Sequence, residues 1–205
     1  MPCVFSYVNA KDPSTSEELL TRALAGEAVA FGMLVRAHQA CVYSLALRML
    51  SDRHEAEDLA QEVFLGLHRN LASVESAAHL EFWLRKVTLN RAIDRLRRRP
   101  RNDLSLEDAG VLISEATDSD PLLQRRLRAL LTQLPPAPRA VVLLRYQEDL
   151  NPNEIARTLN MSINTVKSHL KRSLATLRER LGVNDNPQSG ASALGCFSDE
   201  TGSLT

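Results

Sequence analysis

The sequence predicts an all-α protein: two small helical domains joined by a flexible acidic linker, the second domain containing a helix-turn-helix. Apolar residues recur at spacings of three and four through most of the chain, which is typical of amphipathic helices. Sustained alternation with period two, the pattern of half-buried strands, does not occur, and glycine is scarce at 8 of 205 residues. A chain of this length can bury one moderate core or two small ones.

The first domain is expected to span residues 27–101, after an N-terminal extension of residues 1–26. Its first helix should cover about residues 27–50. Six apolar residues lie near one face of that helix: Phe31, Leu34, Val35, Val42, Leu45 and Met49.

Two further helices are expected in this domain. The second should cover about residues 53–71, since Ser51 or Asp52 can cap the free amides at its start. Its apolar stripe is Leu59, Val63, Leu67 and Leu71. The third should cover about residues 81–98, with Leu89, Ile93 and Leu96 facing the core. Three arginines step along another side of that helix: Arg91, Arg95 and Arg98.

A change of composition separates the two domains. Residues 102–120 carry six acids and no base and lack sustained periodicity, so we expect a flexible linker. The second domain should span residues 121–182. The tail, residues 183–205, is rich in Gly, Ser, Asn and Asp and is expected to be disordered.

Two helix starts about eleven residues apart give the second domain its sharpest signal. Asn151 and Glu154 have the spacing of a capping box, and Pro152 suits the first position of a helix. Asn160 tolerates the left-handed conformation of a sharp turn, and Ser162 can cap the helix that follows. This layout predicts a helix-turn-helix whose second helix enters the major groove of DNA.

Two sets of residues alternate along that second helix. The set expected to pack inward is Ile163, Val166, Leu170 and Leu174. The set expected to face outward is Asn164, Lys167, Ser168, Lys171 and Arg172. The outward set offers hydrogen-bond donors and positive charge to base edges and phosphates. A cationic helical hairpin without a role in DNA binding is the alternative.

The formal net charge is zero, yet charge is strongly segregated along the chain. Residues 51–64 carry a net charge of −4 and residues 102–120 carry −6, whereas residues 85–101 carry +7 and residues 157–180 carry +5. Two basic faces indicate a polyanion contacted at two places, and the acidic segments indicate a different partner. Solvated helix surface is the alternative for any single run.

Several classes of protein are disfavoured. No apolar run is long enough to span a bilayer, and the N-terminus lacks the features of a signal peptide, so we expect a cytoplasmic protein without membrane insertion. Cys3, Cys41 and Cys196 show no paired spacing and are expected to be reduced thiols. HEAED at 54–58 lacks the second histidine of a zinc motif. His38 and Cys41 lie one helical turn apart, but we expect core and surface positions for them and not a metal site. We therefore expect no metal, no cofactor and no enzymatic activity.

Three segments in order carry a family resemblance: AEDLAQEVFLGLHRNL (56–71), FWLRKVTLNRAIDRLRRRPR (82–101) and the stretch 131–181, from LTQLPP to LRERL. In this order they resemble the extracytoplasmic-function (ECF) group of bacterial sigma factors, within the sigma-70 family. The resemblance covers about residues 27–181. It implies a subunit that binds core RNA polymerase and directs promoter recognition and DNA melting, in a stress or envelope response and under the control of an anti-sigma factor.

The resemblance also implies roles for three sets of residues. Contact with core polymerase falls on Asp58, Gln61 and Glu62. Contact with the melted strand of the minus-ten element falls on Trp83, Lys86, Asn90, Asp94, Arg95 and Arg98, with residues 74–83 bordering a base pocket. Contact with the minus-thirty-five element falls on Asn164, Thr165, Lys167, Ser168, His169, Lys171 and Arg172. The arginine stripe then supplies a phosphate track for a single strand. His169 stands where the family often has arginine.

Other interpretations stay open. An ordinary helix-turn-helix regulator without a polymerase-subunit role leaves residues 27–101 unexplained, and a sigma-like decoy needs a neutral recognition helix. Trp83 is either a core anchor or a base contact. Asp94 is either a helical partner of Asn90 or Arg98, or a DNA contact.

Overall fold

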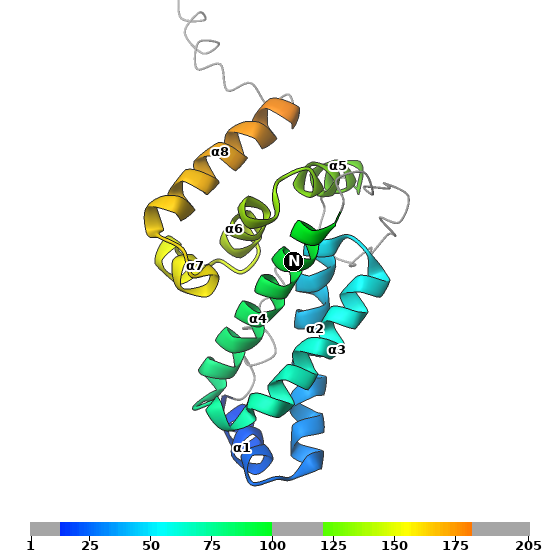
Figure 1. The fold of residues 1–205 in the computed structure, drawn as a ribbon, viewed down its shortest axis with the longest axis vertical. Helices are drawn as coiled ribbons and strands as arrows, with labels where there is room; N and C mark the ends of the chain where they lie inside the picture. Colours follow the sequence, from blue (N-terminus) through cyan, green and yellow to red (C-terminus); the bar gives the residue numbers. More distant parts are fainter. Residues whose placement is uncertain (1–12, 100–120, 182–205) are drawn as a thin grey trace, which may run out of the picture.

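The computed structural model describes residues 13–99 and 121–181, and every regular element within them is a helix (Figure 1). The first domain contains α1 (Pro13–Leu24), α2 (Ala28–Leu50), α3 (Arg53–Asn70), the short 3₁₀ helix η1 (Leu71–Ser73) and α4 (Ala77–Arg98). The second contains α5 (Pro121–Thr132), α6 (Pro136–Tyr146), α7 (Pro152–Leu159) and α8 (Ile163–Leu181). The predicted all-α fold with two helical domains is confirmed. The predicted linker at 102–120 and tail at 183–205 lie outside the described residues.

The first domain is built around α2, α3 and α4, which pack against one another. The predicted stripes supply its core, and their fully buried members include Leu34, Leu45, Leu59, Val63 and Leu89. Phe31 and Val35, which the periodicity places near the core face, are only half-buried and border a surface groove instead. No helix among the described residues is long and apolar enough to cross a membrane.

α1 lies within the expected N-terminal extension, for which the sequence pattern predicts no helix. It packs against α2 and α4, with its buried apolar residues joining the core: Leu19, Leu20 and Ala23. The carboxylate of Glu17 accepts a hydrogen bond of 2.9 Å from the backbone N–H of Ala77. Because Ala77 begins α4, this bond satisfies one of the amides that a helix start leaves open.

The helix starts and the turn follow the predicted chemistry. The carboxylate of Asp52 accepts a hydrogen bond of 2.9 Å from the N–H of Glu55 at the start of α3. Asn151 and Glu154 form a complete capping box at the start of α7. Asn160 ends α7 in the left-handed conformation, with φ 51° and ψ 51°. The predicted helix-turn-helix is therefore present as α7, a sharp turn and α8.

One expectation for the second helix of this motif is wrong. Val166 is buried, and Leu170 and Leu174 are half-buried, as the periodicity predicts. Ile163 is instead 41% exposed. It is the first residue of α8 and lies at the end of the apolar stripe, so its side chain reaches solvent.

The two domains pack directly against each other (Figure 1). α4 contacts both α6 and α7, and α2 contacts α6. Buried residues of both domains form one continuous apolar cluster, which includes Met49 and Leu89 of the first domain and Leu144 and Ile155 of the second. The described state is therefore a closed arrangement, in which α4 packs against helices of both domains.

Candidate protein and nucleic-acid interfaces

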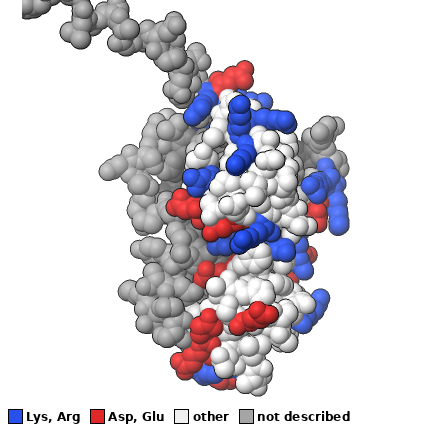
Figure 2. Space-filling model, turned by 90° about the vertical axis from the view of Figure 1, so that its left-hand side faces the viewer, with Lys and Arg blue, Asp and Glu red and all other residues white. Residues whose placement is uncertain are grey.

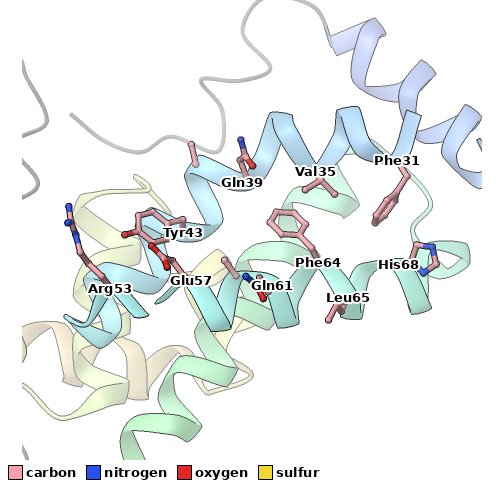
Figure 3. A pocket seen from close by; sticks show the side chains of 12 residues that line it. Phe31, Val35, Gln39, Tyr43, Arg53, Glu57, Gln61, Phe64, Leu65 and His68 are labelled. Atoms are coloured by element: carbon pink, nitrogen blue, oxygen red, sulfur yellow. The ribbon is translucent and has the colours of Figure 1, made fainter. Parts of the chain in front are cut away.

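An apolar groove runs between α2 and α3 on the surface of the first domain (Figure 3). Its walls are mainly aromatic and aliphatic side chains: Phe31, Val35 and Tyr43 from α2, and Phe64 and Leu65 from α3. Arg53 and Glu57 lie at one end, and His68 packs edge-on against Phe31 at the other, with ring centroids 5.1 Å apart. A half-open apolar groove with polar ends suits an amphipathic helix of a partner protein.

The residues predicted to contact polymerase lie along this groove and beside it. Gln61 lines the groove, and Asp58 is exposed on α3. Glu62 is exposed as well, but its carboxylate faces α4. The apolar part of this surface was not predicted from the sequence, above all Leu65, which is 57% exposed. The sequence feature that could have indicated this surface is that Leu65 lies outside the predicted apolar stripe of α3.

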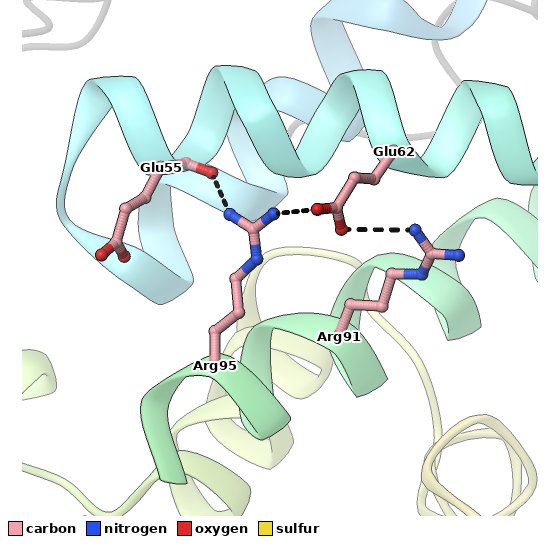
Figure 4. A network of polar contacts seen from close by, with 4 residues as sticks. All are labelled: Glu55, Glu62, Arg91 and Arg95. Atoms are coloured by element: carbon pink, nitrogen blue, oxygen red, sulfur yellow. Dashed lines mark hydrogen bonds and ion pairs between the residues drawn. The ribbon is translucent and has the colours of Figure 1, made fainter. Parts of the chain in front are cut away.

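Glu62 joins the acidic helix to the arginine stripe (Figure 4). One of its carboxylate oxygens lies 2.8 Å from Arg95 and the other lies 3.4 Å from Arg91. Arg95 also donates a hydrogen bond of 2.9 Å to the backbone oxygen of Glu55. Arg99 continues the series, 3.1 Å from the carboxylate of Glu55. Most of the predicted phosphate track is therefore engaged by α3 in this state.

The open side of α4 carries the other residues predicted for the minus-ten element. Lys86 and Asn90 are half-buried, and Asp94 and Arg98 are exposed. The ammonium of Lys86 lies 5.6 Å from the ring centroid of Phe82. Asp94 forms an ion pair of 3.7 Å with Arg97, so its helical partner is neither of the two residues expected from the sequence.

Trp83 has features of both roles that the sequence left open. It packs against the core while remaining half-buried. A Cβ added at Gly66 of α3 would lie 3.5 Å from the Trp83 ring and 3.3 Å from the guanidinium of Arg91. Glycine at position 66 thus lets the indole of Trp83 and the guanidinium of Arg91 approach α3 closely.

The second basic face is the outer side of α8. Its exposed residues are Asn164, Thr165, Lys167, Ser168, Lys171 and Arg172, and His169 is half-buried. Ser162 accepts a hydrogen bond of 3.1 Å from the N–H of Thr165, which caps the helix as predicted. Lys and Arg side chains gather over the upper part of the face in Figure 2, where α7 and α8 lie. The arrangement presents cations and hydrogen-bond donors on the exposed side of α8, near its start, as duplex recognition requires.

The candidate metal positions do not converge. His38 and Cys41 are both buried in the core of the first domain. His54 is exposed on α3, while the carboxylate of Glu55 binds Arg99. Within residues 13–99 and 121–181 there is no group of three or more side chains placed to hold a metal ion.

Comparison with known proteins identifies both helical domains. The family described as Sigma-70 region 2 matches residues 34–102, and the family described as Sigma-70, region 4 matches residues 124–177. RfaY of Xanthomonas campestris, named a probable RNA polymerase sigma factor, is 35% identical over 171 residues, which are 79% of this chain and 43% of that protein. The ECF RNA polymerase sigma factor SigW of Bacillus subtilis is 31% identical over 170 residues, which are 76% of this chain and 91% of that protein.

A solved structure shows the same fold. It contains the sigma factor RpoE in complex with the anti-sigma factor NepR from Bartonella quintana, and the likeness has a TM-score of 0.60 at 23% identity. The likeness covers 75% of this chain and 98% of that chain. The chain thus spans nearly all of SigW and less than half of RfaY.

Proposed function

This chain belongs to the ECF group of sigma-70 factors, and from that premise we propose that it binds core RNA polymerase and directs it to promoters, where it helps to melt the DNA. The observation that carries the proposal is the pairing, in one chain, of a groove suited to a partner helix with two separate basic faces. A regulator that binds only DNA needs one such face and no groove. This function requires no covalent chemistry from the chain itself.

The α2–α3 groove is the proposed contact with core polymerase. Burying exposed apolar side chains such as Leu65 supplies the driving force, and the flanking Asp58 and Gln61 orient a partner helix that carries basic residues. Gel filtration with bacterial core polymerase tests this contact. Leu65→Arg, and separately Asp58→Arg with Gln61→Ala, should weaken co-elution.

The matched control for the groove is Val29→Arg. Val29 is an exposed apolar residue of α2, at 68%, and it does not line the groove. The same change from an apolar to a positively charged side chain at this position should leave co-elution as in the wild type. Equal weakening in both variants would mean that the effect is unspecific, and full co-elution of both would exclude the groove.

The proposed promoter contacts divide between the domains. The open side of α4, with Lys86 and Asn90, takes the unpaired strand of the minus-ten element together with the half-buried Trp83 at its α3 side, because an aromatic ring and cations suit stacked bases and phosphates. The outer side of α8 reads the minus-thirty-five element as duplex. Binding of both elements by one polymerase-bound chain places the melted region downstream of the fixed duplex contact.

Substitutions on α8 test the duplex contact. Lys171→Ala with Arg172→Ala should weaken binding of promoter duplex and lower its salt dependence, by about one unit of slope for each phosphate that the chain no longer neutralises. Arg178→Ala is the control, since Arg178 is exposed on the same helix at its far end. If the Arg178 variant bound duplex as weakly as the double variant, the binding would be general attraction and not recognition.

An anti-sigma factor is the proposed regulator, in the cytoplasm and in response to an envelope or other stress. The structure of RpoE with NepR supports such a partner. We expect it to compete with core polymerase for the α2–α3 groove, because both need the same apolar surface. The test is a competition experiment in which the anti-sigma factor should displace core polymerase from the wild-type chain. Leu65→Arg should weaken the binding of both partners.

A further inference from the structure

Arg85 is a cation of α4 that the second domain covers. Its guanidinium Nε lies 3.7 Å from a carboxylate oxygen of Glu148, and the two side chains are only 12% and 2% exposed. Glu148 follows α6, so this ion pair joins the two domains. Arg85 directly precedes Lys86, one of the residues proposed to contact the minus-ten strand.

A second contact between the domains holds the second domain over Arg85. Arg139 of α6 donates a hydrogen bond of 2.5 Å to the backbone oxygen of Met49 in α2, and Arg139 is itself buried. Together with the contacts of α4 with α6 and α7, this bond holds the second domain over the Arg85 side of α4. Arg85 is therefore masked by the packing of the two domains.

The masking cannot persist on a promoter. The minus-ten and minus-thirty-five elements lie about 25 base pairs apart, or about 85 Å along B-form DNA. α4, with 22 residues, is about 33 Å long and touches α7, whose partner α8 carries the recognition face. If α4 and α8 occupy the two elements at once, α4 and α7 must separate. Arg85 is then uncovered, and its side chain leaves α4 about 100° around the helix from that of Lys86, on the adjoining side.

We propose that Arg85 is a further contact for the promoter strand, and that Glu148 occupies it in the closed arrangement in place of a DNA phosphate. The inference rests on the proposed function. A carboxylate and a phosphate compete for the same guanidinium because both are anions that pair with its positive charge, and the 3.7 Å contact with Glu148 is an ion pair without a hydrogen bond between these two atoms. The closed arrangement thereby lowers the affinity of the unbound chain for single-stranded DNA, and separation of the domains restores it.

Salt dependence of DNA binding tests the contact itself. The full chain, and the holoenzyme that it forms with core polymerase, are each titrated with a short fluorescent single strand of mixed sequence over a range of potassium chloride concentrations. Arg85→Gln should lower the salt slope by about 0.7 in the holoenzyme, the value for one phosphate contact on a single strand. Arg85→Lys should keep the slope, because it keeps the charge. A residue with only a structural role would leave the slope unchanged in both variants.

The competition is tested at Glu148. Glu148→Gln should raise the affinity of the unbound chain for the strand about fivefold, because a buried Arg85 without its anionic partner weakens the closed packing of the two domains. Asp149→Asn is the matched control, since Asp149 is exposed, carries the same charge one residue later and adopts a positive φ of 52° that asparagine tolerates. In an Arg85→Gln background the gain from Glu148→Gln should vanish, and in the holoenzyme it should be absent.

Two results would overturn the inference: a salt slope that Arg85→Gln does not change, or equal gains from Glu148→Gln and Asp149→Asn. Circular dichroism of each variant establishes that the chain is folded. Failure of the wild-type chain to bind core polymerase would instead contradict the proposed function. The difference in salt slope between the unbound Glu148→Gln chain with and without Arg85→Gln would still decide the role of Arg85.

Discussion

The guanidinium of Arg139 donates a hydrogen bond of 2.5 Å to the backbone oxygen of Met49, a residue 90 positions earlier in the chain. Met49 lies in the last turn of α2, where carbonyl groups lack partners within the helix. The same guanidinium also donates to the backbone oxygens of Thr132 and Leu134. One buried side chain of the second domain thus caps the end of a helix in the first and closes the turn before its own helix.

Replacement of Arg139 by leucine should lower the free energy of unfolding by about 2–4 kcal/mol. The apolar side chain leaves the carbonyls of Met49, Thr132 and Leu134 without their donor in a buried place. Burial lowers the pKa of Arg139 to about 10, so the guanidinium is still charged and donating at neutral pH. Denaturant unfolding at neutral pH measures the destabilisation. Arg36→Leu, at an exposed position of α2, should change stability by less than about 0.5 kcal/mol.

His38 should make stability fall in mild acid. Burial lowers the pKa of His38 below its ordinary value of 6.5, so the folded chain keeps the ring neutral while the unfolded chain protonates it. The free energy of unfolding should therefore decrease as pH falls below about 6.5, by at most about 1.4 kcal/mol per pH unit. Denaturant unfolding between neutral pH and pH 5 measures this slope.

The variant His38→Leu should flatten that slope, because it removes the buried titrating group. His54→Gln removes an exposed histidine of α3 and should keep the wild-type slope. If His38→Leu followed the wild-type curve, another group would account for the pH dependence.

Asn160 should accept glycine but not alanine. Its φ of 51° lies in the left-handed region, where alanine costs about 1–2 kcal/mol and glycine costs little. Thermal unfolding should rank the wild type and Asn160→Gly together, above Asn160→Ala. Asn153→Ala, at an exposed position within α7, should be neutral or slightly stabilising because alanine favours helix. Equal stability of the wild type, Asn160→Gly and Asn160→Ala would contradict a conformational requirement at the turn.

Arg95 and Arg98 should separate a structural role from a DNA-binding role. Arg95 bonds Glu62 and the backbone of Glu55, so Arg95→Gln should lower the free energy of unfolding by about 1 kcal/mol. Arg98 is exposed, so Arg98→Gln should leave stability unchanged while lowering the salt slope of single-strand binding. Denaturant unfolding and strand titration of both variants provide the comparison. Equal destabilisation by the two changes would contradict this division.

Features that depend on neighbouring residues were predictable from the sequence. The Asn151–Glu154 capping box joins atoms within a few residues of one another, as does the cap of α3, for which the sequence left Ser51 and Asp52 open and the structure uses Asp52. The left-handed conformation of Asn160 depends on that residue and the turn around it. Apolar spacing likewise predicted the stripes of α3 and α4. Spacing was not sufficient where a helix end breaks the periodicity, as at Ile163, and it did not predict α1.

For the binding surfaces, the sequence predicted which types of residue each helix carries but not how these residues meet. The sequence showed acidic residues on one helix and arginines on another, but Glu62 and Arg95 meet because α3 and α4 pack side by side. The apolar groove exists because two helices leave half-buried rings between them, and no spacing within one helix encodes that gap.

The sequence by itself determined the helices, their caps, the helix-turn-helix and the family of this protein, because these follow from short-range periodicity and from ordered motifs. Only the tertiary structure decided which charges are available to a partner. Arg85, Arg91 and Arg95 look alike in the sequence, yet one faces Glu148 of the other domain and two face Glu62. Pairing across 29 to 63 residues depends on how whole helices pack, and packing is fixed by the burial of both domains at once.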